Sequence, residues 1–196
     1  MLEFIDMFRM GVITDTLDID NESLISFTKE YSTANPKSQI ISNRGGYQSD
    51  DLLKNNNEAW QALLKIIQVR INEAAEFYSI KKKLKLTNNW FNLNNYKDYN
   101  NKHNHPHSII SGVYYIQTFK DCGNIVFHSP ADSEMPLYFE DNFMSKNTEF
   151  NSSRYYMPAI AGRLYLFPGF MGHTVEPNMN KDKQRISMSF NSRYDI

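Results

Sequence analysis

The chain has 196 residues, of which 41% are hydrophobic and 14% aromatic, so it can bury a sizeable core and is long enough for one domain. Its net charge of −1 argues against general binding to nucleic acid or to an anionic membrane surface. The single cysteine, Cys122, excludes an internal disulfide framework and favours a reducing compartment. No apolar run approaches the roughly 18 residues of a membrane helix.

The N-terminal residues lack a basic region followed by an apolar one, so we expect no signal peptide. We therefore expect a cytoplasmic protein. The frequent use of Asn, Lys and Tyr would also suit a virus-encoded protein in the host cytoplasm.

The first part of the chain predicts mainly helices. Residues 1–19 alternate loosely and predict a short strand or an irregular segment. A helix should begin after Asp20 or Asn21, whose short side chains can cap free amides, and should end before Pro36. The strongest helical pattern runs over about residues 57–79, where apolar residues recur at three- and four-residue spacing. They are Trp60, Leu63, Leu64, Ile67, Ile71, Ala74, Ala75 and Tyr78.

From residue 84 onward the pattern changes to short strands separated by turn residues. We expect strands at 84–87, 90–93, 111–118, 124–128, 163–167 and 185–191. Strands that follow helices predict an α+β protein with an antiparallel sandwich or barrel. We expect one domain over residues 1–196, in which a mainly helical part (1–83) packs on a β core (84–196). A long polar insert near 129–158 is a candidate lid, because loops of this length inside a domain are usually functional or disordered.

Three of the five histidines lie within five residues, at His103, His105 and His107. A period of two places alternate side chains on the same side of an extended strand, so any two of these could bind one metal ion. His103 and His105 could supply two ligands, and the distant His173 a third. Imidazole ligands suit both non-haem Fe(II) and zinc, so the histidines alone do not identify the metal.

The segment that begins at Arg185 has a period of two and gives a second indication of a binding site. Ile186, Met188 and Phe190 should face the helices, and Arg185, Ser187 and Ser189 should face the other way. An unpaired buried charge is costly, so an arginine inside a sandwich needs a partner. A bound carboxylate would serve, because a guanidinium forms two parallel hydrogen bonds with it and Ser187 can donate another.

The order of these motifs resembles a known family. A His-x-His pair precedes the Ser-Gly-Val-Tyr-Tyr run at 111–115 and the Cys-Gly-Asn-Ile-Val-Phe run at 122–127. The Gly-Arg-Leu-Tyr-Leu-Phe-Pro run at 162–168, His173 and an Arg-x-Ser motif follow. This arrangement, over roughly residues 84–196, is similar to the 2-oxoglutarate/Fe(II)-dependent dioxygenase superfamily. It is nearest to the prolyl-hydroxylase-like branch and its bacterial and phage relatives.

The resemblance implies a double-stranded β-helix (a jelly roll) with Fe(II) between its two sheets and 2-oxoglutarate as the second cofactor. His103 and His173 match the two histidine ligands of the family. Arg185 and Ser187 match the Arg-x-Ser that holds the distal carboxylate of 2-oxoglutarate. Tyr115 matches a strand tyrosine that supports this carboxylate, and Asn92 is expected to line the same cavity. The implied activity is hydroxylation with release of succinate and CO2.

One position departs from the family pattern. His105 stands where the family usually has Asp or Glu, so a third histidine ligand would remove one negative charge from the metal site. Two alternatives therefore stay open beside the oxygenase. One is a cupin-like metal-binding protein or enzyme that does not use 2-oxoglutarate, and the other is a structural protein with a degenerate site. The sequence does not identify the substrate, which could be a small molecule or a peptide. It leaves a homo-oligomer open and indicates neither a membrane nor a nucleic-acid partner.

Overall fold

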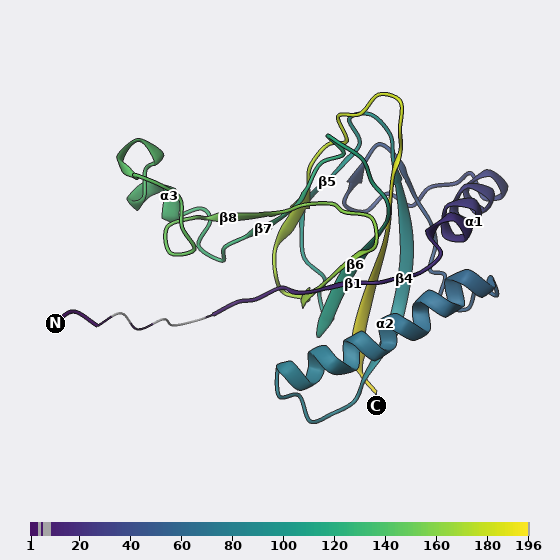
Figure 1. Cartoon of the computed structure of the whole chain (residues 1–196), viewed down its shortest axis with the longest axis horizontal. Coiled ribbons are helices and arrows are strands. Elements are labelled where there is room, and N and C mark those ends of the chain that lie inside the picture. Colours follow the sequence, from purple (N-terminus) through teal and green to yellow (C-terminus); the bar gives the residue numbers. More distant parts are fainter. Residues whose placement is uncertain (4, 6–8, 196) are drawn as a thin grey trace.

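The structure is a computed structural model that describes residues 1–3, 5 and 9–195, and its core consists of two antiparallel sheets (Figure 1). The large sheet has the strand order β1 (Ile13–Thr16), β9 (Arg163–Pro168), β6 (Ile110–Gln117), β11 (Arg185–Tyr194), β4 (Leu84–Asn94) and β3 (Tyr47–Gln48). The small sheet has the order β2 (Asn43–Arg44), β5 (Tyr99–His103), β10 (His173–Val175), β7 (Ile125–His128) and β8 (Arg154–Met157). The helical elements are α1 (Asn21–Ala34), α2 (Glu58–Phe77), α3 (Met135–Tyr138) and the 3-10 helix η1 (Asp141–Phe143).

The two long helices cover the large sheet, on the side away from the small sheet (Figure 1). The side chain of Asp20 caps α1 by accepting from two backbone amides, and Asn57 caps α2 by accepting from the amide of Trp60. The predicted apolar stripe of α2 is buried from Trp60 to Ala75. Burial of this stripe, more than helix propensity, is what holds a helix of this length on the sheet.

Strand β11 separates the helix-facing core from the space between the sheets. Ile186, Met188 and Phe190 are fully buried in the cluster that includes α1 and α2. Ser187 and Ser189 point to the opposite side and line a cavity between the sheets. The alternation predicted for this strand is therefore confirmed, and so is the α+β double-stranded β-helix.

The strand predictions differ from the structure in two respects. The two strands expected at 84–87 and 90–93 form one continuous strand, β4, which pairs with β11 along its length. Strands β2, β3, β5, β8 and β10 were not predicted, whereas β1 falls within residues 1–19, where a short strand or an irregular segment was expected.

The segment at residues 129–153 projects from the body of the molecule and carries α3 and η1 (Figure 1). It leaves from the end of β7 and returns through β8, which pairs with β7 at the edge of the small sheet. Within the described residues, none of the helices is long and apolar enough to cross a membrane.

Candidate functional site

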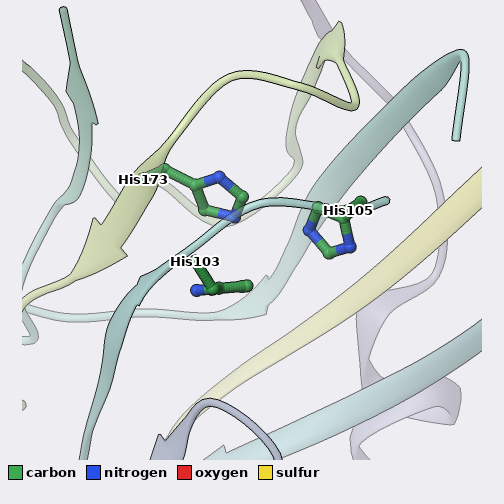
Figure 2. A group of neighbouring side chains, drawn as sticks. All are labelled: His103, His105 and His173. Carbon is green, nitrogen blue, oxygen red and sulfur yellow. The ribbon is translucent and has the colours of Figure 1, made fainter. Parts of the chain in front are cut away.

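Three histidines converge between the two sheets at the neighbouring strands β5 and β10. His103 ends β5 and His173 begins β10, and these two residues are paired across the strands. His105 follows on the connection after β5, where its backbone amide donates to the carbonyl of Gly169 at 2.8 Å. The rings point toward one another (Figure 2), and one ring nitrogen of each lies within 4.8 Å of the others. This is the spacing of a set that can hold one metal ion.

The other ring nitrogens of two histidines are already bound to the backbone. His103 Nδ1 lies 2.7 Å from the carbonyl oxygen of Asn101, and His173 Nδ1 lies 2.9 Å from that of Met171. A carbonyl oxygen only accepts, so each Nδ1 carries the proton and each Nε2 is unprotonated, with a lone pair that can bind a metal. Hydrogen bonds of this kind orient metal-binding histidines and fix their tautomer.

Burial keeps the three imidazoles neutral, as a metal ligand requires. Desolvation lowers the pKa of His103 below its usual 6.5 and that of His105 to about 4. Burial lowers the pKa of His173 well below 6.5, and the neighbouring His103 acts in the same direction. Phe167 packs edge-on against the His173 ring at 4.9 Å between ring centroids, which helps to exclude water from this side.

The two remaining histidines lie elsewhere. His107 is exposed in a turn with a positive φ of 67°, so the extended strand expected through residue 107 ends at His103. His128 is buried at the end of β7 and bonds through Nδ1 to Asp132.

The predicted carboxylate-binding residues lie beside the histidines. Asn92, Tyr115 and Ser187 line the same cavity as the three histidines, and Arg185 lies two residues before Ser187 on β11. The pKa of Tyr115 is raised by burial, so its hydroxyl keeps its proton and can donate. The cavity has a volume of about 40 Å³, room for a few water-sized groups, so a bound dicarboxylate would have to displace lining side chains.

Arg185 is completely buried, and only one of its three guanidinium nitrogens has a hydrogen-bond partner. Its Nη1 donates to the backbone carbonyls of Cys122 and Glu176, whereas Nε and Nη2 have no hydrogen-bond partner. A Cβ at position 123 would lie 2.9 Å from Nη1, so Gly123, whose φ is +82°, leaves room for the arginine. A buried guanidinium with free donors is costly unless an anion binds to it.

Other unpartnered polar atoms gather in the same place. Among the described residues, the Tyr115 hydroxyl and the Asn92 carboxamide oxygen are also buried without a hydrogen-bond partner. Native proteins leave few such atoms, and a bound ligand is an accepted reason for them. The donor set therefore fits a cosubstrate with a carboxylate, and the three neutral imidazoles fit Fe(II).

Several cavity residues were not identified from the sequence. Ser42 Oγ lies 3.4 Å from His103 Nε2 and accepts a hydrogen bond from Asn100 Nδ2 at 3.0 Å. Trp90 lies on β4 with its ring 5.9 Å from that of His105. Trp90 and Asn92 lie two positions apart on β4, so their side chains share a face of the strand, and this spacing is visible in the sequence. The approach of Ser42 to His103, across 61 positions, has no local signal.

The projecting segment does not contribute to the cavity wall. Within the described part of the chain, the lining residues come from the two sheets, from Ser42 and from His105 on the connection after β5, and none lies in 129–158. The lid expected there from loop length therefore stays a prediction.

The comparisons with known proteins agree with this geometry. No curated protein matches the chain by sequence. Among solved structures, a prolyl-4-hydroxylase from Pseudomonas putida is similar with a TM-score of 0.67 and 14% identity, over 95% of this chain and 94% of that one. A viral collagen prolyl hydroxylase from Paramecium Bursaria Chlorella virus-1, in complex with 2-oxoglutarate, has a TM-score of 0.60 and 11% identity, over 93% and 96%.

HygX from Streptomyces hygroscopicus, with nickel and 2-oxoglutarate bound, has a TM-score of 0.62 and 10% identity, over 95% of this chain and 84% of that one. At such low identities these structures establish the fold. The family itself comes from the sequence profile, because residues 88–191, more than half of the chain, match the family described as "Putative 2OG-Fe(II) oxygenase". The chain belongs to this family of non-haem iron dioxygenases, whose cofactors are Fe(II) and 2-oxoglutarate.

Proposed function

We propose that this oxygenase hydroxylates an organic substrate, either a small molecule or a peptide, and that His103, His105 and His173 are its iron ligands. The convergence of three neutral imidazoles, two of them oriented by backbone carbonyls, supports this assignment. When bound, Fe(II) and 2-oxoglutarate supply the oxidising chemistry, in which 2-oxoglutarate and O2 give succinate, CO2 and a hydroxylated product. The similarity in fold to prolyl hydroxylases agrees with hydroxylation.

The observation that carries the proposal is the buried, half-satisfied guanidinium of Arg185. Its free Nε and Nη2 can donate two parallel hydrogen bonds to the distal carboxylate of 2-oxoglutarate. The Tyr115 hydroxyl and the Ser187 hydroxyl can donate to the same carboxylate, and Asn92 lines the adjoining wall. These groups hold the cosubstrate at one end, so that its other end faces the histidines.

The third histidine sets the charge of the site. Three neutral ligands leave the full +2 charge of the metal, whereas two histidines and a carboxylate would leave +1. The two carboxylates of 2-oxoglutarate carry −2 and the Arg185 guanidinium carries +1, so the occupied site would have a net charge of +1 with three histidines and of zero with two histidines and a carboxylate. Because desolvating net charge is costly, the third histidine makes the occupied site harder to bury between the aromatic rings.

The proposed chemistry of the site can be tested by anaerobic titration with Fe(II) and then 2-oxoglutarate, followed by succinate measurement after addition of air. We expect a charge-transfer absorption band that needs both ligands, and slow release of succinate even without substrate. Arg185→Met should bind Fe(II) normally and lose the band. Metal binding without any response to 2-oxoglutarate would instead favour the cupin-like alternative, and failure to bind either would favour a degenerate site.

The place of action is a separate proposal. We propose that the protein works in the cytoplasm, because its one cysteine is buried and unpaired, as is common in a reducing compartment.

A further inference from the structure

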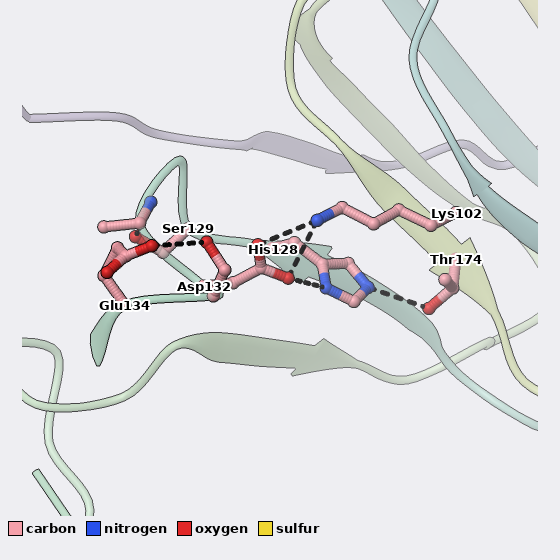
Figure 3. A network of polar contacts seen from close by, with 8 residues as sticks. Lys102, His128, Ser129, Asp132, Glu134 and Thr174 are labelled. Carbon is pink, nitrogen blue, oxygen red and sulfur yellow. Dashed lines mark hydrogen bonds and ion pairs between the residues drawn. The ribbon is translucent and has the colours of Figure 1, made fainter. Parts of the chain in front are cut away.

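A chain of polar contacts lies on the outer face of the small sheet, directly behind the histidines. Side chains alternate along a strand, so Lys102 and Thr174, the neighbours of His103 and His173, point to the face opposite the cavity. Both reach the same network there (Figure 3). The two ligand-bearing strands are thus connected a second time, through side chains.

Asp132 is the centre of this network. Lys102 Nζ donates to both of its carboxylate oxygens at 2.8 Å, and His128 Nδ1 lies 2.9 Å from Oδ2. His128 Nε2 in turn lies 3.2 Å from the hydroxyl of Thr174. The hydrogen bond from Lys102 lowers the pKa of Asp132, so the carboxylate stays ionised. We call Lys102, His128, Asp132 and Thr174 the outer clamp.

The outer clamp fastens the strands where their backbone pairing is irregular. Strands β5 and β10 pair at His173–His103 and at Val175–Asn100, with a register shift between the two pairs. The ladder is therefore interrupted beside the ligands themselves. The stem of Lys102 also passes close to Gly172, where a Cβ would lie 3.3 Å from Lys102 Cε. Side-chain contacts across this point can hold the separation of the two imidazoles.

The same carboxylate belongs to the projecting segment. Asp132 lies four residues after His128, where the segment leaves β7, and the Ser129 amide bonds to the Ser153 carbonyl at the segment's base. Beyond this base the segment exposes large apolar side chains, among them Tyr138 and Phe143. Because Asp132 lies at the base of the segment, a movement of the segment would shift the Asp132 carboxylate before it reached the strands.

We propose that Asp132 is a positioning residue that couples the projecting segment to the metal centre. While Asp132 keeps its contacts with Lys102 and His128, the outer clamp holds β5 and β10 at the spacing that His103 and His173 need to share one ion. The proposal rests on the proposed function only in taking these histidines as ligands. By linkage, if the contacts of Asp132 strengthen metal binding, the bound metal must strengthen those contacts and so steady the base of the segment.

The first test is metal affinity, measured with Co(II), whose absorption spectrum also reports the geometry of its ligands. Asp132→Ala should weaken Co(II) binding about tenfold, the low end of the effect of residues that orient metal ligands, and alter the spectrum. Glu140→Gln removes one charge from an exposed position in the same segment and should change neither. His103→Ala should abolish binding.

The second test is proteolysis of the segment, which probes the reverse direction of the coupling. Co(II) should slow cleavage between residues 134 and 152 in the unmodified protein and not in Asp132→Ala. If Asp132→Ala does not fold, as judged by circular dichroism, Lys102→Met breaks the clamp from the β5 side and should show the same two effects.

The outcomes separate this inference from the function. Equal Co(II) affinity and equal protection in the folded clamp variant and the unmodified protein would overturn the coupling and leave the metal site intact. Absence of Co(II) binding in the unmodified protein would overturn the proposed ligands, and the coupling with them.

Discussion

At the scale of single residues, His105 decides what kind of metal centre this is. His105→Ala removes one of the three proposed ligands and should lower Fe(II) affinity at least tenfold. His105→Asp restores a carboxylate and should keep Fe(II) within about tenfold of the original affinity, while it weakens 2-oxoglutarate, since the dianion then meets a site of charge +1 instead of +2.

Anaerobic titration of both variants, with Fe(II) first and 2-oxoglutarate second, measures the two affinities. His107→Ala is the matched control, because His107 is an exposed histidine two positions away. If His105→Ala binds Fe(II) as well as the unmodified protein, His105 is not a ligand.

Ser42 should act against metal binding. Its hydroxyl lies 3.4 Å from Nε2 of His103, the nitrogen that a metal would use. A long hydrogen bond of this kind contributes about 0.5 kcal/mol, and it must break when the metal binds. Ser42→Ala should therefore raise Fe(II) affinity about twofold, which calorimetry under nitrogen can measure. A lower affinity would show instead that Ser42 helps to hold the metal.

The histidines and Arg185 could be predicted because each signal is local or follows a family pattern. The spacing of His103 and His105, and the alternation that starts at Arg185, each involve residues that lie close together in the sequence. Ser42 and Asn100 were missed because tertiary structure alone brings a loop and a strand together at His103. The unsatisfied atoms of Arg185 are likewise a property of packing, and no sequence pattern reveals them.

At the scale of elements, α2 should stabilise the fold without touching the chemistry. Asn57 accepts a hydrogen bond from the Trp60 amide at 3.0 Å and caps the helix. Asn57→Ala should lower the free energy of unfolding by about 1 kcal/mol and Tm by about 2–4 °C. Fe(II) affinity should not change, because the helix packs on the far side of the large sheet. Denaturant unfolding with a parallel Fe(II) titration checks both statements.

Strand β6 needs glycine where three strands meet. A Cβ at Gly112 would lie 2.3 Å from Phe190 Cζ and 2.5 Å from the Tyr165 carbonyl oxygen. Gly112→Ala should therefore destabilise the protein by about 1–3 kcal/mol through overpacking. Gly11→Ala is the control, since a Cβ there meets nothing within 4 Å. Thermal unfolding of the two variants should differ clearly, and equal Tm values would contradict the close packing.

Long elements were predicted more accurately than short ones, for a physical reason. Helix α2 and strand β11 repeat their burial pattern many times, so periodicity identifies them. Strands β8 and β10 span four and three residues, too few for a period to stand out. Their positions are set by pairing with β7, a contact with residues distant along the chain.

At the scale of the whole molecule, the fold places the two ends of the site on opposite sheets. The histidines come from the small sheet and its connection, and Arg185 and Ser187 come from the large sheet. A ligand that binds to both therefore joins the sheets. The pattern of short strands could predict that a sandwich forms, but only the strand order brings β5 beside β10 and makes one site of residues about 70 positions apart.

This arrangement predicts how the cofactors change thermal stability. A ligand that binds only the folded state at 100 times its Kd adds about 2.7 kcal/mol, which corresponds to a Tm increase of about 5–10 °C for a chain of this length. Anaerobic Fe(II) and 2-oxoglutarate together should produce such an increase. 2-Oxoglutarate alone should produce less, because without the metal it is held only at its Arg185 end. In Arg185→Met the Fe(II) increment should persist and the 2-oxoglutarate increment should vanish. Equal 2-oxoglutarate increments with and without Arg185 would mean that the cosubstrate does not bridge the sheets at this residue, and that the buried guanidinium serves another anion.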